Sequence, residues 1–383
     1  MVSFLSSRFK NFFLLLACFV FFLFRGRANR PQKSFRRILV SQQAKLGDMV
    51  CTTPVFVAIK KHFPGTEVFV AGREMNKDLL HGHPSVTAYF VIENDFFSFW
   101  RQVRKAKFSV AITATPDFAT LALLYLSGVP LIIVPKVEGG WSPYETFSYR
   151  LSRRLVVSVP HIFTQYAPRE YLRLLEPLGI FTDDTTKTLS ITSEAKERIS
   201  SFFRDQRIHE GDILVGISPS SGNKIKNWGG KNFAEVASRL AKNPKRDGKV
   251  KIIIVGGERD KEEVREFLSA LPESVRVINT GEKLLLEELK ALIARLHLFI
   301  AVDTGPIYIA EAFGVPTVDI VGPMDENGQP PRGEKHVVVV PPHRKEPMLH
   351  IMNARIYDIA EARRQVESIT PEMVIEAAER MLM

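Results

Sequence analysis

The sequence predicts an α/β protein of two consecutive domains, each with a parallel sheet covered by helices on both faces. Short runs rich in Val and Ile alternate along the chain with stretches long enough for helices. Continuous apolar runs of this kind are typical of strands that are buried on both faces. The length of 383 residues exceeds what one hydrophobic core usually holds, and the alternation restarts after a polar connection at 182–187.

The expected elements follow this alternation in both halves of the chain. In the first half we expect strands at 38–41, 67–71, 89–92, 108–113 and 131–134, and helices that include 53–62 and 167–178. In the second half we expect strands at 213–218, 250–255, 275–278, 298–302 and 317–321, and helices that include 306–313 and 371–381. The last helix has no strand after it and fits either domain.

The positive charge is concentrated at the N-terminus. The net charge is +10, but residues 1–37 hold eight basic side chains and no acidic one. The rest of the chain has 44 basic and 42 acidic residues and is nearly neutral. This distribution favours a membrane surface and not a nucleic acid as the partner of the basic segment. The only cysteines, Cys18 and Cys51, indicate neither a disulfide framework nor a metal site and fit a reducing compartment.

The N-terminal apolar run at 12–24 has thirteen residues without charge and basic residues on both sides. A spanning helix needs about 20 residues. We expect a retained membrane anchor, either a helix that dips into one leaflet or a short helix that spans the bilayer, with the body on the cytoplasmic side. A cleaved signal peptide is a second interpretation, although 25–31 offers a poor cleavage site and its positive charge opposes export. A helix packed on the body or on a partner is the third.

The turn after the strand at 298–302 is a candidate anion site. Thr304 is a capping residue type, and Pro306 suits the first turn of a helix. Backbone N–H groups at a helix N-terminus lack intrahelical acceptors and favour a phosphate or diphosphate. The alternative is an ordinary capped turn.

The segment 41–50 follows the first strand, where loops of an open α/β sheet face the ligand crevice. Asp48 in this segment is placed to act on a ligand as a carboxylate. The alternative is a helix cap, which is a common use of an acidic residue near a helix start. Gly47 allows a tight turn beside it in either case.

The segment 216–228 occupies the equivalent place in the second domain. Hydroxyls of Ser218, Ser220 and Ser221 stand near two lysines, Lys224 and Lys226, which together suit a phosphate clamp. The alternative is a solvated surface loop.

Glu258 ends the next strand-to-helix segment. Its carboxylate suits hydrogen bonds from ribose hydroxyls or a base, or it caps the next helix. No G-x-G-x-x-G or G-x-x-x-x-G-K-[ST] signature and no Asp-x-Asp or His/Cys cluster occurs in the sequence. We therefore expect no metal and no cofactor.

Several of these segments, taken in order, resemble glycosyltransferase family 9, the ADP-heptose:lipopolysaccharide heptosyltransferases. The likeness runs from about Ile38 to the C-terminus. It rests on K-L-G-D-M-V-C-T-T-P at the start of 45–64, on the segment 161–180, on K-N-W at 226–228, on D-T-G-P at 303–306 and on G-V-P-T at 314–317.

The resemblance implies a GT-B fold, in which two Rossmann-like domains face a central cleft. It also implies metal-independent, inverting transfer of a heptose from ADP-heptose to a lipid-linked glycan, the lipopolysaccharide core or a similar envelope glycolipid. We expect a membrane anchor and basic linker at 1–34, an acceptor-side domain at 35–185, a nucleotide-sugar-binding domain at 186–355, and C-terminal helices at 356–383 that pack back on the acceptor-side domain. The expected location is the cytoplasmic face of the inner membrane.

Carried over by position, Asp48 matches the general base, Lys226 the lysine on the donor diphosphate, and Glu258 a residue near the nucleoside. Thr304 and Gly305 match residues that give backbone N–H groups to the phosphates. The predicted donor site also includes Ser218, Ser220, Asp303, Pro306 and Tyr308. The chain departs from the family at Tyr308, where a histidine is usual, and lacks the cysteines common near the family's C-terminus.

The predicted acceptor contacts are basic and aromatic residues of the first domain: Lys45, Arg101, Arg104, Trp141 and Arg150. The segment 95–108 mixes aromatic with basic side chains and suits an interfacial helix. The alternative is an ordinary surface helix with an apolar core face. Two rival functions remain at this point: a transferase of the same fold with another nucleotide-sugar donor, and a non-catalytic sugar-nucleotide-binding scaffold.

Overall fold

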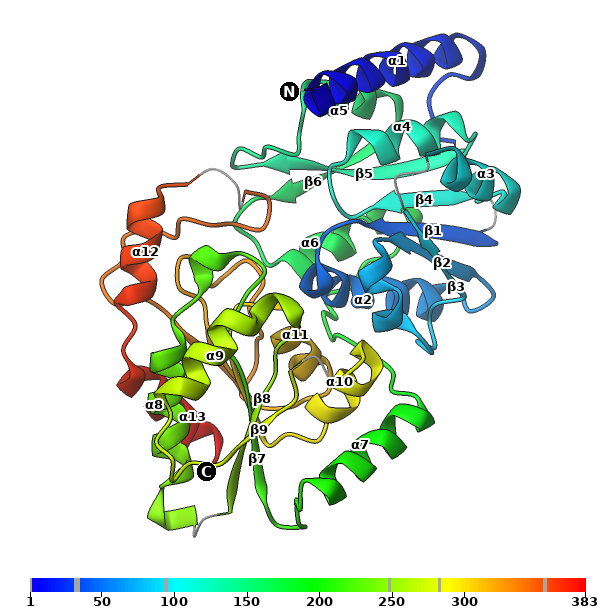
Figure 1. Ribbon diagram of the computed structural model, residues 1–383. Coiled ribbons are helices and arrows are strands. Elements are labelled where there is room, and N and C mark those ends of the chain that lie inside the picture. The colour runs from blue at the N-terminus through cyan, green and yellow to red at the C-terminus, as the bar shows by residue number, and fades with distance from the viewer. Residues whose placement is uncertain (1, 31–34, 93–95, 247–248, 282–283, 354–356) are drawn as a thin grey trace. The chain divides into compact units, whose positions relative to one another are not determined.

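The computed structural model describes residues 2–30, 35–92, 96–246, 249–281, 284–353 and 357–383 (Figure 1). The chain divides into two compact units, Met1–Thr186 and Lys187–Met383. Each unit contains one sheet and the helices that cover it, as the alternation of apolar runs predicts.

The first unit has a six-stranded sheet with the order β3-β2-β1-β4-β5-β6, and all neighbouring strands are parallel. Its strands are β1 (Arg37–Gln42), β2 (Glu67–Gly72), β3 (Ala88–Val91), β4 (Val110–Thr113), β5 (Leu131–Glu138) and β6 (Val157–Ile162). This is the strand order of a doubly wound Rossmann sheet. Successive strands are added on one side of the first strand up to the third, and from the fourth onward they are added on its other side.

Helices cover both faces of this first sheet (Figure 1). The helices of the first unit are α1 (Val2–Arg25), α2 (Leu46–His62), α3 (Phe96–Ala106), α4 (Phe118–Leu126), α5 (Phe147–Ser152) and α6 (Ala167–Arg173). Buried side chains of α1, α3, α4 and α5 form one core with the sheet, whereas α2 and α6 pack together on the other side.

The second unit repeats the design, with the order β12-β11-β10-β7-β8-β9 and parallel pairing throughout. Counted from β7, this is again the Rossmann order. The strands are β7 (Ile213–Ser218), β8 (Val250–Ile254), β9 (Val277–Asn279), β10 (Leu298–Val302), β11 (Thr317–Ile320) and β12 (His336–Val339).

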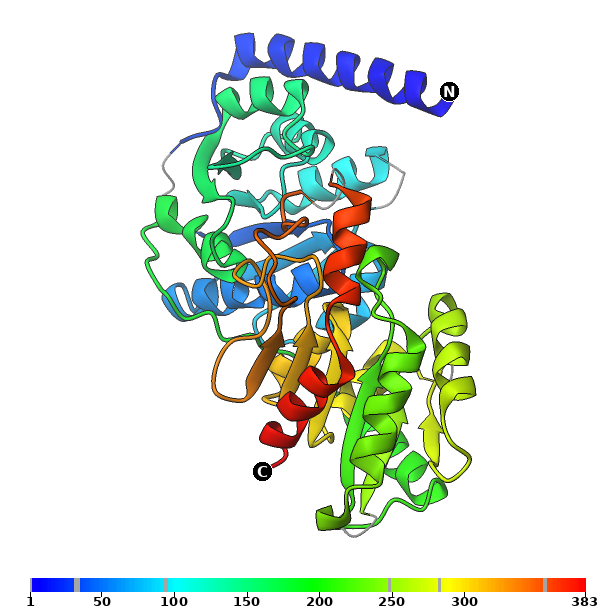
Figure 2. The ribbon, with the colours of Figure 1, turned by 90° about the vertical axis from the view of Figure 1, so that its left-hand side faces the viewer.

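The helices of the second unit also lie on both faces of its sheet. They are α7 (Ser193–Asp205), α8 (Gly230–Ala241), α9 (Lys261–Ala270), α10 (Leu286–Ile293), α11 (Gly305–Ala312), α12 (Ile359–Glu367) and α13 (Pro371–Met381). Helix α13 packs beside α8 in the core of this unit (red and green in Figure 2), and Val366 of α12 joins the same core. The C-terminal helices are therefore part of the second unit's core.

The predicted bounds of β7, β10 and α13 are confirmed, and most other strands are shifted by one or two residues. Two edge strands, β6 and β12, were missed. Helix α2 begins at Leu46 and not at residue 53, so the segment predicted as a loop already contains its first turn. The helix predicted at 167–178 ends at Arg173, and a 3-10 turn (Glu176–Leu178) follows.

The N-terminal apolar run lies within a 24-residue helix, α1, which packs against α4 and α5. Cys18 is fully buried there, with Sγ 4.0 Å from the carbonyl oxygen of Ala122. The Arg25 guanidinium donates to the carbonyl oxygens of Tyr125 and Val129. Of the three interpretations, packing on the body is the one that the structure shows.

Among the residues that the structure describes, no helix combines the length and the hydrophobicity that crossing a bilayer requires.

The close contact between α8 and α9 gives a test of the fold. A Cβ on Gly230 would stand 2.5 Å from the backbone nitrogen of Phe267 and 2.9 Å from the carbonyl oxygen of Glu263. We expect Gly230→Ala to lower the free energy of unfolding by about 1–3 kcal/mol, because backbone atoms cannot move aside cheaply. Thermal unfolding measures this. Gly65→Ala is the control, since a Cβ at Gly65 meets no atom within 4 Å, and an equal effect of the two variants would contradict the packing.

Candidate active site

In both sheets the predicted site segments follow the strands at which the strand order reverses. In the first unit, β1 leads into the segment that holds Lys45 and Asp48. In the second unit, β7 leads into 219–227, and β10 leads into Asp303 and Thr304. Ligands of open α/β sheets bind at the carboxyl ends of the strands beside this reversal point. The topology therefore supports a ligand site in each unit.

The segment after β1 is held by side chains that sequence reasoning missed. Gln42 is fully buried, donates to Thr52 Oγ1 at 3.0 Å and accepts from Thr115 Oγ1 at 3.0 Å. Arg73 donates to the carbonyl oxygen of Gln43 at 2.7 Å, and Asn76 donates to that of Ala44 at 3.2 Å. These bonds fix the backbone that carries Lys45. A glutamine at the end of a predicted strand was the only feature of the sequence that could have indicated that Gln42 holds this segment.

Asp48 lies in the first turn of α2 and is half-buried. Its Oδ2 accepts a hydrogen bond from the Lys45 backbone N–H at 3.1 Å, which confirms the capping interpretation. Burial, with the carboxylate of Asp48 as a further cause, raises the pKa of Tyr171 on α6 well above its usual value. Asp48 thus stands with part of its surface open and a neutral phenol nearby. Its role as a base stays a prediction.

Asp303 is the centre of the site in the second unit. Its side chain is almost fully buried after β10, and Oδ2 lies 2.8 Å from the Nζ of Lys226. Lys226 also donates to the carbonyl oxygen of Asp303, and the hydroxyl of Tyr308 donates to Oδ1. Lys226 and Tyr308 therefore meet on one carboxylate at the start of α11.

The N-terminus of α11 offers few hydrogen-bond donors. Thr304 occupies the capping position, but its side chain makes no capping hydrogen bond, so the predicted role of its hydroxyl is wrong. Pro306 has no N–H, and the N–H of Ile307 donates to the carbonyl oxygen of Thr304 at 3.2 Å. Among the described residues, the N–H groups of Thr304 and Gly305 have no acceptor. Both residues are half-exposed, so these two N–H groups are candidates for binding an anion.

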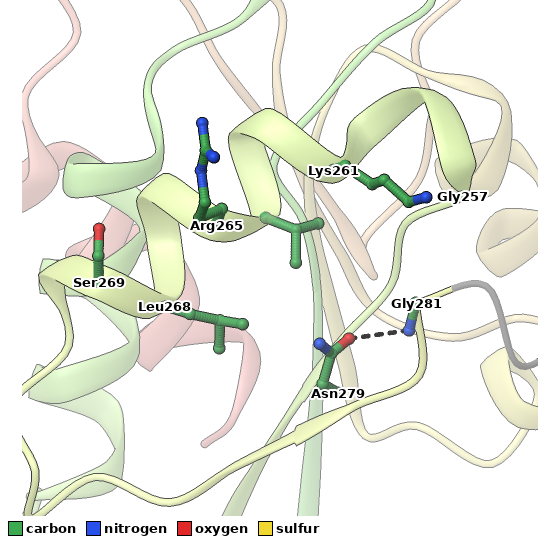
Figure 3. Close-up of a pocket in the computed structure, with 8 residues that line it drawn as sticks. Gly257, Lys261, Arg265, Leu268, Ser269, Asn279 and Gly281 are labelled. Carbon is green, nitrogen blue, oxygen red and sulfur yellow. Dashed lines mark hydrogen bonds between the residues drawn. The ribbon is translucent and has the colours of Figure 1, made fainter.

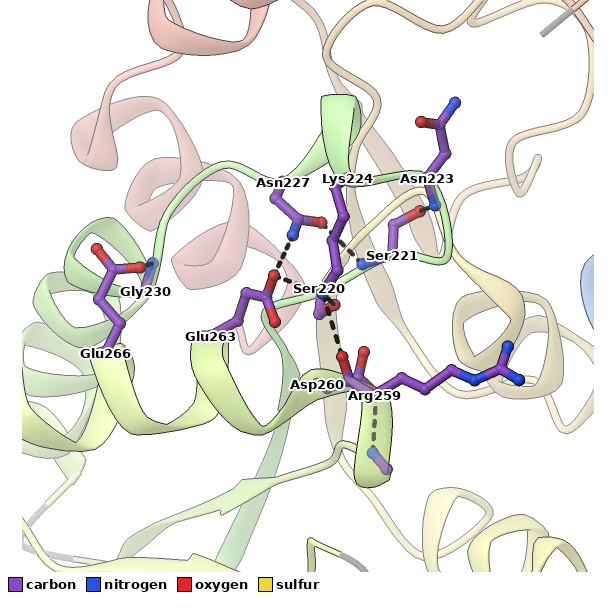
Figure 4. A network of polar contacts seen from close by, with 11 residues as sticks. Ser220, Ser221, Asn223, Lys224, Asn227, Gly230, Arg259, Asp260, Glu263 and Glu266 are labelled. Carbon is purple, nitrogen blue, oxygen red and sulfur yellow. Dashed lines mark hydrogen bonds and ion pairs between the residues drawn. The ribbon is translucent and has the colours of Figure 1, made fainter. Parts of the chain in front are cut away.

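The segment 219–227 is tied to α9 and is not a solvated loop (Figure 4). Lys224 Nζ lies 2.5 Å from Glu263 Oε1, and Asn227 donates to the same oxygen at 2.7 Å. The Ser221 backbone N–H donates to Asn227 Oδ1 at 2.9 Å. The two lysines of the predicted clamp therefore have different partners. Lys224 pairs with Glu263 of α9, whereas Lys226 pairs with Asp303.

The serines of the predicted clamp are buried. Ser218 is the last residue of β7, and Ser220 accepts a hydrogen bond from Lys224 Nζ at 3.4 Å. Next to this segment, Trp228 is buried in the core and its Nε1 donates to the carbonyl oxygen of Ile369 at 2.8 Å. Gly229 then turns the chain with a φ of +100°, a region that glycine enters at little cost. Trp228 thus anchors the backbone that presents Lys226.

Glu258 begins a 3-10 turn before α9. Its side chain is 73% exposed and lies 2.5 Å from the Nζ of Lys261. A surface pocket of about 450 Å³ opens nearby, between α9 and the edge strand β9. Gly257 and Gly281 are among the residues that line it, and the Gly281 N–H donates to Asn279 Oδ1 at 2.8 Å (Figure 3). None of the predicted donor residues lines this pocket.

A second buried carboxylate shares the sheet face of Asp303. Asp319 on β11 pairs in register with Ala301 on β10, two residues before Asp303, so both carboxylates project from the same face. Neither oxygen of Asp319 has a hydrogen-bond partner among the described residues. Burial, with Asp303 as a further cause, raises its pKa well above the usual value. The raised pKa favours the neutral form of the Asp319 carboxyl.

The predicted acceptor residues are spread over the first unit. Lys45 is exposed and lies beside Asp48. Arg101 and Arg104 lie on the exposed side of α3, which has a buried face, so the reading of this segment as a surface helix with a core face is confirmed. Trp141 and Arg150 lie on the connection from β5 through α5 and are also exposed. Their contact with an acceptor stays a prediction.

No three His, Cys, Asp or Glu side chains cluster as metal ligands within the described residues.

Residues 96–355 match the sequence model of glycosyltransferase family 9 (heptosyltransferase). The chain belongs to glycosyltransferase family 9. It is therefore an enzyme of the heptosyltransferase type. A similar relative is lipopolysaccharide heptosyltransferase 3 of Escherichia coli, which is 24% identical over 298 residues, or 73% of this chain and 81% of the relative.

Solved structures of family members share the fold. The family 9 glycosyltransferase of Veillonella parvula is similar with a TM-score of 0.73 and 22% identity, over 91% of this chain and 97% of that chain. The E. coli heptosyltransferase WaaC, solved with ADP-2-deoxy-2-fluoro heptose, has a TM-score of 0.63 and 15% identity, over 90% of this chain and 99% of that chain. The two parallel-sheet α/β domains of this family 9 enzyme therefore match those of heptosyltransferases.

The neutral state of Asp319 gives a prediction for pH. In the unfolded chain this carboxyl ionises near its ordinary pKa of about 3.9, whereas in the fold its pKa is raised. Its contribution to stability is therefore complete below about pH 4 and is lost as the pH rises toward the folded pKa. We expect Asp319→Asn to raise the free energy of unfolding at pH 7 by about 1–3 kcal/mol, with the difference shrinking toward pH 4. Denaturant unfolding across this range measures it, and a difference independent of pH would contradict a neutral Asp319.

Proposed function

We propose that this enzyme transfers a heptose from ADP-heptose, with inversion, to a lipid-linked glycan such as the lipopolysaccharide core, at the cytoplasmic face of the inner membrane. Membership of family 9 supports the reaction class. The name of the E. coli relative supports the acceptor class, and the ligand of WaaC supports the donor. The observation that carries the proposal is the position of Lys226, which Asp303 holds at the N-terminus of α11.

Lys226 is suited to bind the diphosphate of the sugar donor because one N–H group of its ammonium is not used by Asp303. A lysine ammonium has three N–H donors, and the carboxylate and carbonyl oxygens of Asp303 take two of them. The third can meet a phosphate oxygen, together with the backbone N–H groups of Thr304 and Gly305. These groups offset the charge that grows on the leaving nucleoside diphosphate as the glycosidic bond breaks. In this proposal no metal is needed, and Glu258 lies beside the nucleoside.

Tyr308 stands where the family usually has a histidine, and we propose that its phenol has a different role from that imidazole. Its hydroxyl is engaged with Asp303 Oδ1, and the side chain is buried. We assign it the task of holding the carboxylate so that Oδ2 remains for Lys226. Tyr308 is in this sense a positioning residue for the donor lysine.

Asp48 supplies the base in the proposed reaction. Its carboxylate takes the proton of the acceptor hydroxyl, the hydroxyl oxygen bonds to the anomeric carbon from the face opposite the diphosphate, and the bond from that carbon to the phosphate oxygen breaks. The configuration at the anomeric carbon is inverted, and the nucleoside diphosphate leaves with the bonding electron pair. The Lys45 N–H donates to Oδ2 of Asp48, and a carboxylate accepts hydrogen bonds at both oxygens, so capping and proton transfer are compatible.

Asp48→Asn separates the two uses of this side chain. An asparagine oxygen still accepts from the Lys45 N–H and still caps α2, but it does not take up a proton at neutral pH. With ADP-heptose and extracted envelope glycolipid, we expect the variant to release nucleoside diphosphate about 10²- to 10⁴-fold more slowly than the native enzyme, with an unchanged melting temperature. Release at the native rate would remove the base assignment. Parallel reactions with other nucleotide sugars test the donor, and no release with any donor would contradict transferase activity.

The two lysines of the second unit form a matched pair. Lys226→Ala removes the ammonium at the start of α11, and we expect kcat/KM for the donor to fall about 10²- to 10³-fold. Lys224→Ala removes an equal charge two residues away, where the lysine pairs with Glu263 of α9. Its side chain is half-exposed, so we expect less than a tenfold fall. Steady-state kinetics on both variants gives the comparison, and equal losses would show that general positive charge matters and not the position of Lys226.

A further inference from the structure

Helix α1 has two apolar stripes on opposite sides. Leu14, Leu15, Cys18, Phe21 and Phe22 pack into the core with α4. The other stripe, which we name the outer stripe, contains side chains that are 49–85% exposed: Phe12, Phe13, Leu16, Val20, Leu23 and Phe24. Its spacing of three, four or one residues keeps these side chains on one side of a helix. An apolar stripe of this length on a folded unit marks a binding surface.

The inner stripe fixes α1 to the first unit. Beyond the buried Cys18, the Tyr125 hydroxyl donates to the carbonyl oxygen of Gly26, just after the helix. The next residues continue the attachment: the Ala28 N–H donates to the carbonyl oxygen of Leu155 at 2.8 Å, and the Ile132 N–H donates to that of Ala28 at 3.0 Å. Figures 1 and 2 show α1 lying along the outside of the helix layer of this unit. The outer stripe is therefore held in one orientation relative to the first sheet.

The charges around the outer stripe match an anionic surface. Residues 1–37 contain no acidic side chain, and basic residues stand in the sequence on both sides of the stripe. Arg27 and Arg30, which follow the helix, are exposed. Phe97 of α3 and Phe147 of α5 are also exposed, and these helices share the core of α1. Aromatic and aliphatic side chains bordered by cations are the composition of a helix that lies in the interface of an anionic bilayer.

We propose that the outer stripe of α1 docks the protein on an anionic bilayer, with the helix axis in the plane of the membrane. The apolar side chains enter the boundary between headgroups and acyl chains, while the arginines bind lipid phosphates. Because α1 is fixed to the first unit, docking orients that unit, including Asp48, relative to the lipid surface. Docking depends on α1 and not on the proposed reaction.

Vesicle flotation of the full chain tests this surface. We expect the native protein to float with vesicles of phosphatidylcholine and phosphatidylglycerol, and to float less with pure phosphatidylcholine or at high salt. The test variant replaces Phe12, Phe13, Leu16 and Leu23 by Gln, a good helix former. Its vesicle partition coefficient should fall at least about a hundredfold, with an unchanged melting temperature. The matched control replaces four exposed apolar residues elsewhere, Met75, Phe181, Leu285 and Ile359, by Gln and should float as the native protein does.

Three outcomes would overturn the proposal. In the first, the native protein does not float with either kind of vesicle. In the second, the test variant floats as well as the control variant. In the third, α1 pairs two copies of the chain and does not bind lipid. In the last case sedimentation without lipid shows a native dimer that the test variant abolishes, and the native protein stays off the vesicles. A further variant, Arg27→Gln with Arg30→Gln, should lose binding to the anionic vesicles and change little with pure phosphatidylcholine. Flotation without donor is independent of catalysis, and transfer to a soluble acceptor glycan is independent of docking, so the two proposals fail separately.

Discussion

The buried ion pair between Lys226 and Asp303 is the interaction on which the proposed donor site depends. Removing two charges from water is costly, and the attraction offsets this only where hydrogen bonds satisfy the rest of both groups. Here the Tyr308 hydroxyl takes the second oxygen of Asp303, and the Asp303 carbonyl takes another proton of Lys226. Trp228, bonded to the backbone of Ile369, fixes the segment that carries the lysine. The pair thus joins the segment after β7 to the segment after β10, and the hydrogen bond of Trp228 joins the first of these to the connection between α12 and α13.

The sequence predicted the architecture well because parallel strands buried on both faces are continuous runs of Val and Ile. Strands β7 and β10, at the centre of their sheet, were predicted with correct bounds. The missed strands, β6 and β12, are the outermost strands of their sheets, and their residues are partly exposed. Strand β6 contains Pro160, which ordinarily argues against a strand, and is tolerated because an edge strand need not donate on both sides. Edge position is a tertiary property that a local pattern does not contain.

The candidate site was predictable as a set of segments but not as a set of contacts. The segments around Asp48, Lys226 and Asp303 follow strands, which the pattern of apolar runs indicates. The separate partners of Lys224 and Lys226 depend on Glu263 of α9, which no motif connects with them. The apolar run of α1 posed the same problem, since both of its stripes are apolar and the sequence has no polar side to reveal which stripe packs on the body. Only packing against α4 distinguishes them.

The two buried carboxylates of the second sheet place a condition on the proposed binding of the donor. If Asp303 and Asp319 were both ionised on one sheet face, Lys226 would be attracted by two negative charges, and an incoming diphosphate would be repelled by both. Burial raises the pKa of Asp319 well above its usual value, which favours its neutral form, and one oxygen of the Asp303 carboxylate is occupied by Tyr308. The lysine is then held firmly enough to be positioned, yet it retains a proton donor and positive charge for the phosphates. In the proposed site the phenol at position 308 and the neutral acid at 319 would therefore both affect donor binding through the same lysine.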